Sequence, residues 1–182
     1  MTDSEPRRIG VSIELKPHAY DPMTNPELFE GVLARRMIAF VIDLAIIVVP
    51  IVLAALFMAA ATIATLGLAA ILFVFLSPLY WPLIVIWALC YYGYTFASEA
   101  SATIGMRVMD LEMRTWYGTP AYFVLGAVHG LLFWLSTSFL TPLILLVGLF
   151  NDRKRLLHDM VVGTVVINNP ARAQMIREVR RG

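Results

Sequence analysis

The sequence has little charge and a single cysteine. Of its 182 residues, 15% are charged and 59% are hydrophobic, whereas a soluble domain averages about 25% charged and about 45–50% apolar residues. Cys90 cannot form an intramolecular disulfide and lies within an apolar stretch, where a thiol behaves as a small hydrophobic group. A net charge of +1 creates no field that attracts nucleic acid. These shortages exclude a soluble enzyme, a nucleic-acid-binding domain and a disulfide-rich secreted module.

The few charged residues leave two long stretches of the chain uncharged. Residues 44–98 contain no Asp, Glu, Lys or Arg over 55 positions, and residues 115–151 contain none over 37 positions, although His129 lies among them. A membrane-spanning helix needs about 20 apolar residues to cross about 30 Å of hydrocarbon. The first stretch is therefore long enough for two spans, and the second for one span or a bent pair of shorter helices. This pattern predicts an all-α integral membrane protein.

Local signals indicate where the first two spans begin and end. The first is expected over residues 35–61 and the second over residues 68–96, joined by a short turn at Thr65-Leu66-Gly67. Neighbouring helices can accommodate prolines within such spans. The prolines concerned are Pro50, Pro78 and Pro82. Residues 1–30 are expected to form a polar cytoplasmic tail, and residues 169–182 a basic C-terminal tail, on either side of a membrane domain over residues 31–168.

The basic residues predict the topology. Because Lys and Arg favour the cytoplasmic side, the pair at 35–36 places the N-terminus in the cytoplasm, and two spans return the chain there. A bent helical hairpin over residues 121–150 keeps the basic cluster 153–155 on that side. It also brings together residues 106–113 and 163–168, whose patterns predict short strands. We favour two transmembrane helices plus this hairpin and a small cytoplasmic β pairing; the alternative is three full spans.

Arg36 and Asp43 mark one face of the first span. They are seven residues apart, or about two helical turns, so they share a face and lie about 10 Å apart along the axis. An ionised residue at mid-span costs about 2.5–3.5 kcal/mol on insertion scales, so Asp43 needs a partner, a hydrated cavity or a proton. Two interpretations stay open: an ion or proton site, and a buried clasp that pairs Asp43 with an Arg of another element.

Three motifs follow one another along the chain. Residues 36–43 read Arg-Met-Ile-Ala-Phe-Val-Ile-Asp, residues 103–108 read Thr-Ile-Gly-Met-Arg-Val, and residues 154–159 read Lys-Arg-Leu-Leu-His-Asp, followed by Gly-Thr-Val-Val at 163–166. Together they resemble the RDD domain family of membrane proteins, which is named for one Arg and two Asp residues. The resemblance covers about residues 30–168. The family's usual Pro and Lys in the middle motif are replaced here by isoleucine and methionine.

The resemblance implies that the named residues are Arg36, Asp43 and Asp159, which form a family-motif and ion site. Four further polar side chains are expected to support them: Arg107, Arg155, His158 and His129. We expect Arg36 to lie beside Asp43, and Arg107 beside Asp159. No metal site is expected, because the adjacent His158 and Asp159 point to different faces of a helix and no other His or carboxylate is near in sequence. No cofactor is expected.

For the RDD family, the resemblance implies transport of unidentified ligands and, for some members, cation/proton antiport. We therefore expect a non-enzymatic, multi-pass protein of the bacterial inner membrane that is involved in transport, with the lipid bilayer as its surroundings and further copies of itself as its partners. The alternative is an accessory or assembly subunit of a larger membrane complex. The spacing of the polar residues matches no nucleophile, paired-acid or phosphate-loop arrangement, and no nucleic acid is expected as a partner.

Overall fold

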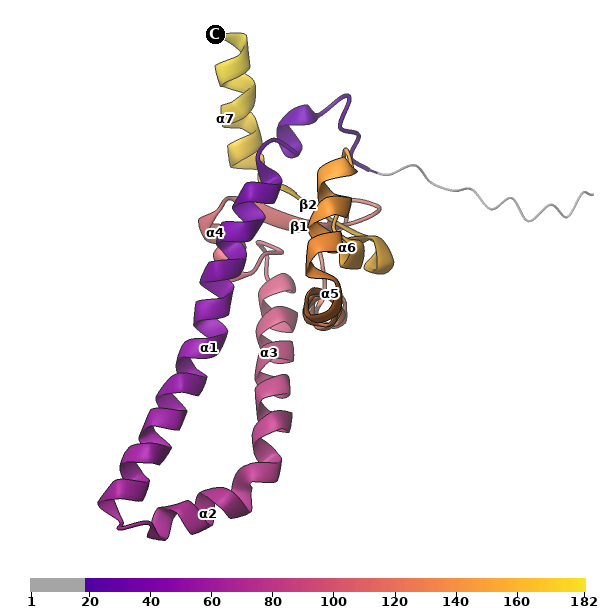
Figure 1. The fold of residues 1–182 in the computed structure, drawn as a ribbon. Helices are drawn as coiled ribbons and strands as arrows, with labels where there is room; N and C mark the ends of the chain where they lie inside the picture. The colour runs from indigo at the N-terminus through magenta and orange to yellow at the C-terminus, as the bar shows by residue number, and fades with distance from the viewer. Residues whose placement is uncertain (1–18) are drawn as a thin grey trace, which may run out of the picture.

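Two long helices extend from a small head, which consists of short helices and a two-stranded sheet formed by residues 104–115 and 157–181 (Figure 1). The computed structural model describes residues 19–182, except for the side chains of residues 140–146. Residues 1–18 of the predicted N-terminal tail lie outside the described residues. Below the head, α1 (Val32–Ala64) and α3 (Tyr80–Phe96) move apart, and α2 (Leu68–Leu76) connects their far ends.

The two spans predicted for residues 35–61 and 68–96 form the two helical arms. Helix α1 continues through Pro50 and ends at Ala64; beyond its cap residue Thr65, Leu66 and Gly67 adopt positive φ values of 50° and 93° and reverse the chain. The second predicted span, residues 68–96, is interrupted between α2 and α3 by the 3₁₀ turn η2 (Ser77–Leu79), which contains Pro78, a residue with no backbone N–H to donate.

Among the described residues, two helical stretches are long and apolar enough to cross a membrane. They are Pro26–Ala64 and Leu68–Phe96, and in the most apolar 18 residues of each, 11% and 0% of the residues are buried within the chain. A core helix of a soluble protein buries one face. The exposure of these helices is therefore consistent with spans that face lipid.

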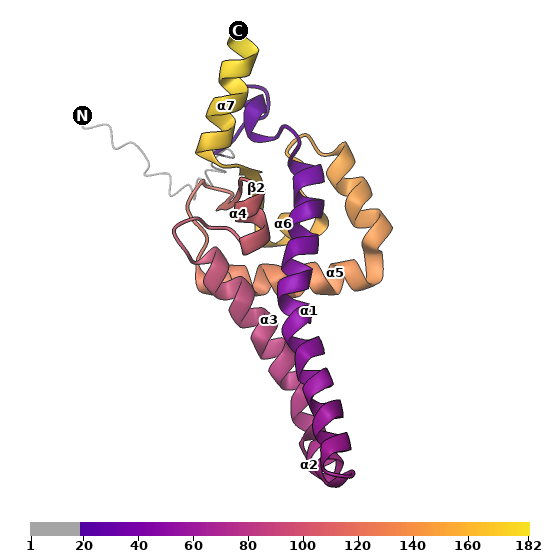
Figure 2. The ribbon, with the colours of Figure 1, turned by 90° about the vertical axis from the view of Figure 1, so that its left-hand side faces the viewer.

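The second uncharged stretch, residues 115–151, contains one helix, α5 (Phe123–Phe150). Figure 2 shows α5 running across α1 and then bending, so this stretch forms one bent helix in place of the predicted hairpin of two shorter helices. Gly126 allows α5 to lie against α3, because a Cβ atom at this position would come within 2.7 Å of the Phe96 Cβ.

The head contains the predicted two-stranded pairing. Strand β1 (Leu111–Thr115) runs antiparallel to β2 (Thr164–Asn168), with Met113 opposite Val166. The pairing is confirmed, but the first strand begins later than predicted. Residues 104–108 instead form the short helix α4 (Ile104–Val108), since the Thr103 side chain accepts a hydrogen bond from the Met106 N–H and caps it.

The described parts of both predicted tails pack onto the head. Helix α6 (Leu157–Val162) leads through β2 into α7 (Pro170–Arg181), which covers the expected C-terminal tail. Arg177 of α7 pairs with Glu27, 2.5 Å away, in the turn η1 (Pro26–Leu28). The Asn168 Nδ2 atom donates to the carbonyl oxygens of Glu27 and Glu30. These contacts tie the segment before α1 to the C-terminal end of the chain.

Candidate functional site

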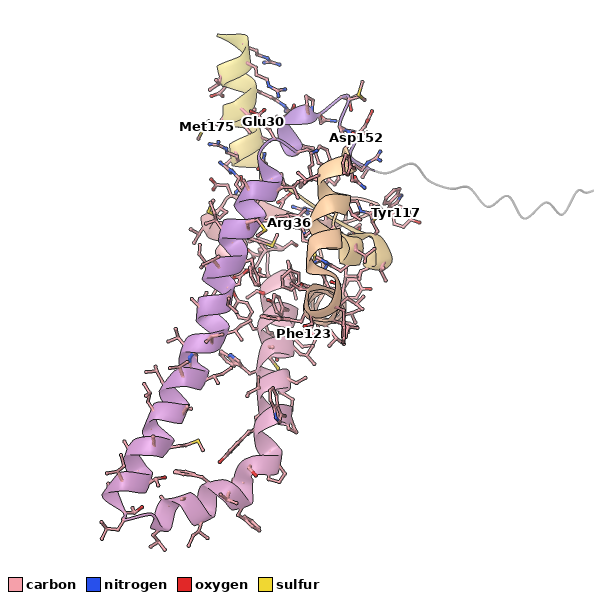
Figure 3. The ribbon with its side chains drawn as sticks, in the orientation of Figure 1. Glu30, Arg36, Tyr117, Phe123, Asp152 and Met175 are labelled. Atoms are coloured by element: carbon pink, nitrogen blue, oxygen red, sulfur yellow. The ribbon has the colours of Figure 1, made fainter. Side chains whose placement is uncertain are left out.

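A buried ion pair joins α1 to α6. The Arg36 guanidinium donates through Nη1 to Asp159 Oδ2 at 2.5 Å and through Nη2 to Asp159 Oδ1 at 3.1 Å. Such two-pronged contacts are the strongest form of the Arg–carboxylate pair. Figure 3 shows Arg36 near the head end of α1. Asp159 is held in place because its Oδ2 atom also accepts from the Leu156 N–H at the start of α6, at 2.8 Å.

Two buried histidines complete the surroundings of Asp159. The Nε2 atom of His158 lies 3.4 Å from Asp159 Oδ1, and that of His129, on α5, lies 3.7 Å away. Burial alone would raise the pKa of Asp159, but the Arg36 guanidinium, helped by the two imidazoles, holds this pKa well below its ordinary value. Burial lowers the pKa of His158 to about 4. At neutral pH the cluster therefore contains an ionised carboxylate and a neutral His158.

Arg155 connects this cluster to the sheet. Its Nε atom donates to the Thr164 carbonyl oxygen and its Nη2 atom to the Asp159 carbonyl oxygen, each at 2.8 Å. The guanidinium also lies over the Trp116 ring, 4.9 Å from its centroid, at a distance where a cation is attracted to the ring face. Arg155 thus holds α6 and β2 together.

Asp43 lies deeper on α1 and accepts three hydrogen bonds. Its Oδ1 atom accepts from the Tyr91 hydroxyl at 2.5 Å and from the Gly105 N–H at 2.7 Å, and its Oδ2 atom accepts from the Thr103 hydroxyl at 2.6 Å. Glycine is required at 105, because a Cβ atom there would come within 2.1 Å of the Ala39 carbonyl oxygen. Asp43 therefore fastens α4 and α3 to α1.

A cavity of about 60 Å³ lies between the two clusters. Its polar lining comes from Arg36, Asp43, Thr103, His129 and His158. A water molecule needs roughly 10–15 Å³ of such space together with polar partners, so the cavity has room for a few waters or a small ion. Of the three residues named by the family resemblance, Arg36 and Asp43 line this cavity, whereas Asp159 contacts Arg36 and is not part of the wall.

The predicted pairing of the charged residues was wrong. Arg36 contacts Asp159 and not Asp43, because α6 brings Asp159 to the level of Arg36, whereas Asp43 lies two turns further along α1 and already has three donors. Arg107 does not reach Asp159; it donates to the Ala102 carbonyl oxygen at 3.1 Å and to the Ser98 hydroxyl at 2.6 Å. Arg107 therefore stabilises its own loop.

The sequence interpretation missed Tyr91 and the direct role of Thr103 and Gly105. Thr103 and Gly105 belong to the motif at residues 103–108 that resembles the RDD loop. That motif was the available signal for their contacts with Asp43. Tyr91 has no such signal, because it is one of several aromatic residues in α3.

One group of described residues brings three possible metal-ligand side chains together. His129, His158 and Asp159 are all buried, and one possible ligand atom from each lies within 4.8 Å of the others. The expectation of no metal site considered only neighbours in sequence. The fold adds His129 from α5, 30 residues away from Asp159 in the sequence.

The fold and the site define a small helical protein with two apolar candidate spans and a head that is fastened to the first span by buried Arg and Asp side chains. The RDD family model matches residues 31–163, and the chain belongs to the RDD family. This match confirms the resemblance that the three motifs indicate. No curated protein and no solved structure matches the chain.

Proposed function

We propose that this protein takes part in the transport of a small cation, protons included, and that the cation is exchanged at Asp43. We place it in the bacterial inner membrane as a multi-pass protein with a cytoplasmic N-terminus. The observation that supports this function is the cavity of about 60 Å³ with Arg36, Asp43 and two histidines in its wall. Ionisable residues inside a membrane protein that face a hydrated cavity are typical of ion pathways.

Asp43 retains capacity to bind one more group. Each carboxylate oxygen can accept about two hydrogen bonds. The Oδ1 atom of Asp43 accepts from Tyr91 and Gly105, whereas the Oδ2 atom accepts from Thr103 alone. A cation or proton in the cavity therefore has an oxygen lone pair available at Oδ2, without any need to break the contacts that hold α4.

Arg36 tunes the affinity of the cavity without touching Asp43. Because Asp159 fixes its guanidinium, a positive charge stays in the cavity wall. Repulsion from this charge weakens cation binding, and a transported ion must bind weakly enough to leave. The two candidate spans among the described residues do not enclose a pathway alone, so we propose that the working unit is a homo-oligomer.

Asp43→Asn tests this function. The variant removes the negative charge, while the Tyr91 and Thr103 hydroxyls can turn to match the amide. In vesicles that contain a pH-sensitive dye, we expect wild-type protein to couple an imposed cation gradient to a pH change and Asp43→Asn to lose this coupling. Glu99→Gln removes the charge of an exposed residue and should leave it intact. Equal flux in wild type and Asp43→Asn, with both folded, contradicts the proposal.

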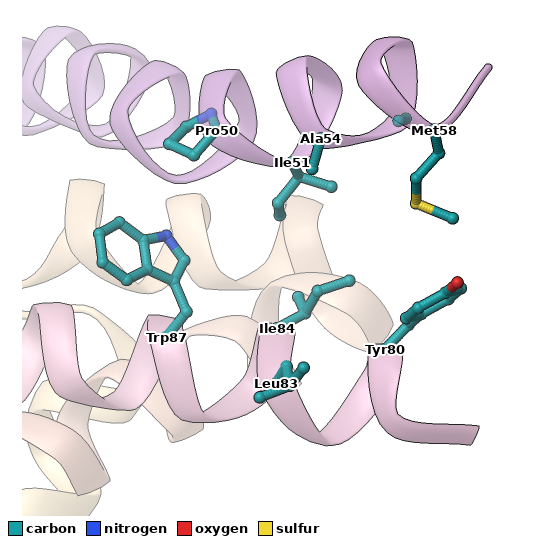
Figure 4. Close-up of a pocket in the computed structure, with 9 residues that line it drawn as sticks. Pro50, Ile51, Ala54, Met58, Tyr80, Leu83, Ile84 and Trp87 are labelled. Atoms are coloured by element: carbon teal, nitrogen blue, oxygen red, sulfur yellow. The ribbon is translucent and has the colours of Figure 1, made fainter. Parts of the chain in front are cut away.

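An accessory role in a larger complex is the second candidate function. It is favoured by an apolar cleft of about 490 Å³ between α1 and α3, shown in Figure 4, whose walls include Pro50, Ile51, Leu83 and Trp87. A cleft of this kind can take a helix of another subunit. Purification in mild detergent followed by mass spectrometry separates the two functions. A stoichiometric foreign subunit favours the accessory role, and a pure homo-oligomer favours transport.

A further inference from the structure

Three ligand atoms converge at the base of the head. The Nε2 atoms of His129 and His158 lie 3.7 and 3.4 Å from Asp159 Oδ1, and all three residues are buried. Bonds of about 2.0–2.2 Å to a tetrahedral metal ion place neighbouring ligand atoms roughly 3.4 Å apart. The two distances therefore match two edges of a tetrahedral site.

We propose that His129, His158 and Asp159 bind a divalent transition-metal cation of the zinc and cobalt class. Two imidazoles and one carboxylate form a ligand set that these ions accept, whereas calcium and magnesium prefer oxygen ligands. The inference goes beyond the proposed function, because metal binding at equilibrium requires no flux.

The outer nitrogens of the two imidazoles have partners suited to such a site. His129 Nδ1 lies 3.3 Å from the Thr164 hydroxyl, and His158 Nδ1 lies 3.5 Å from the Ser136 hydroxyl. A ligating histidine usually hydrogen-bonds through its other nitrogen, which fixes the ring and directs its free lone pair to the metal. Here the hydroxyls contact Nδ1 of each histidine, so Nε2 of each ring faces Asp159.

Arg36 competes with the metal for this site. Its Nη2 atom lies 3.1 Å from Asp159 Oδ1 and 3.4 Å from His158 Nε2, so a bound cation has to displace this group. The other half of the ion pair can remain, because Nη1 contacts the opposite oxygen, Oδ2. The adjacent cavity, which Arg36 and both histidines line, provides space for the displaced group and for a water as the fourth ligand.

The test is a Co²⁺ titration of the full-length protein in detergent, followed by visible absorption. We expect the absorption bands of a tetrahedral Co²⁺ site with wild type, and affinity lower by about 10-fold or more in His129→Ala and in His158→Ala. His18→Ala removes the remaining histidine and should not change the affinity. Arg36→Lys keeps one positive charge but loses the second N–H group, and should bind Co²⁺ more tightly than wild type.

Two results overturn the proposal: no tetrahedral Co²⁺ spectrum with folded wild type, or unchanged affinity when both buried histidines are replaced. If the His variants do not fold, X-ray absorption of the wild-type Co²⁺ complex decides the question. Two imidazole ligands confirm the site, and a shell without imidazole contradicts it. Metal binding without flux leaves this site established and contradicts only the transport function.

Discussion

Replacing Arg36 by methionine is expected to lower the free energy of unfolding by about 3–5 kcal/mol, because it leaves the Asp159 carboxylate buried without its main counter-charge. Asp159 is fully buried and cannot turn towards water. Burial is the largest cause that lowers the pKa of His158, and burial still opposes a positive charge on this imidazole when Arg36 is removed. Thermal denaturation of the purified protein in detergent measures the effect.

Arg35→Met is the matched control for this prediction. Arg35 is the neighbouring residue on α1, but its contact with the half-exposed Asp110 measures 4.0 Å, and such surface pairs contribute at most about 1 kcal/mol. Arg35 also donates to the Met109 carbonyl oxygen at 3.0 Å, a contact that contributes about 1 kcal/mol. We expect the loss in Arg36→Met to exceed that in Arg35→Met by about 1–3 kcal/mol. Similar losses of stability in both would show that the Arg36–Asp159 pair does not hold the head to α1.

Replacing Gly105 by alanine is expected to cost about 2–5 kcal/mol, which combines overpacking with a lost hydrogen bond to a charged group. A Cβ atom at 105 would come within 2.1 Å of the Ala39 carbonyl oxygen and 2.9 Å of the Asp43 Cγ. Both obstacles belong to α1, so α4 has to move away. The Gly105 N–H then loses its 2.7 Å bond to Asp43. Thermal denaturation again measures the loss.

Ile104→Pro is the control for Gly105→Ala at the next residue. Ile104 is the first residue of α4, a position that suits proline because its N–H has no partner within the helix. The preceding Thr103 already has the extended conformation that proline requires. We expect little change in stability, since only a 3.3 Å contact from the Ile104 N–H to the Tyr91 hydroxyl is lost. If Ile104→Pro is as unstable as Gly105→Ala, the loss of stability in Gly105→Ala does not come from the clash of its Cβ atom with α1.

The helices could be predicted from the sequence because their signals are local. The uncharged stretch at residues 44–98 and the turn at Thr65–Gly67 determine the two arms. The pairing of β1 with β2 could be predicted as well, since it follows from the side of the membrane on which each strand was expected. The residue at which β1 begins could not be predicted, because it depends on the positive φ of Asp110 and on helix α4, which Thr103 caps.

The contacts of the site could not be predicted, because they depend on how distant elements meet. Arg36 and Asp159 are separated by 123 positions in sequence, and their contact requires the chain to return through α5 to the head end of α1. His129 enters the site through the same path. The spacing of Arg36 and Asp43 correctly placed both on one helix face, and both line the cavity, but a shared face does not determine which charges pair.

The most direct test of the central claim, that a cation is exchanged in the cavity between Arg36 and Asp43, is flux through a variant that fills the cavity. Ala39 is buried in its wall, whereas Ala45 on the same helix is exposed. In vesicles reconstituted with equal amounts of folded protein, cation-driven pH change should be strongly reduced in Ala39→Val and unchanged in Ala45→Val. Wild-type flux through Ala39→Val would contradict exchange in this cavity.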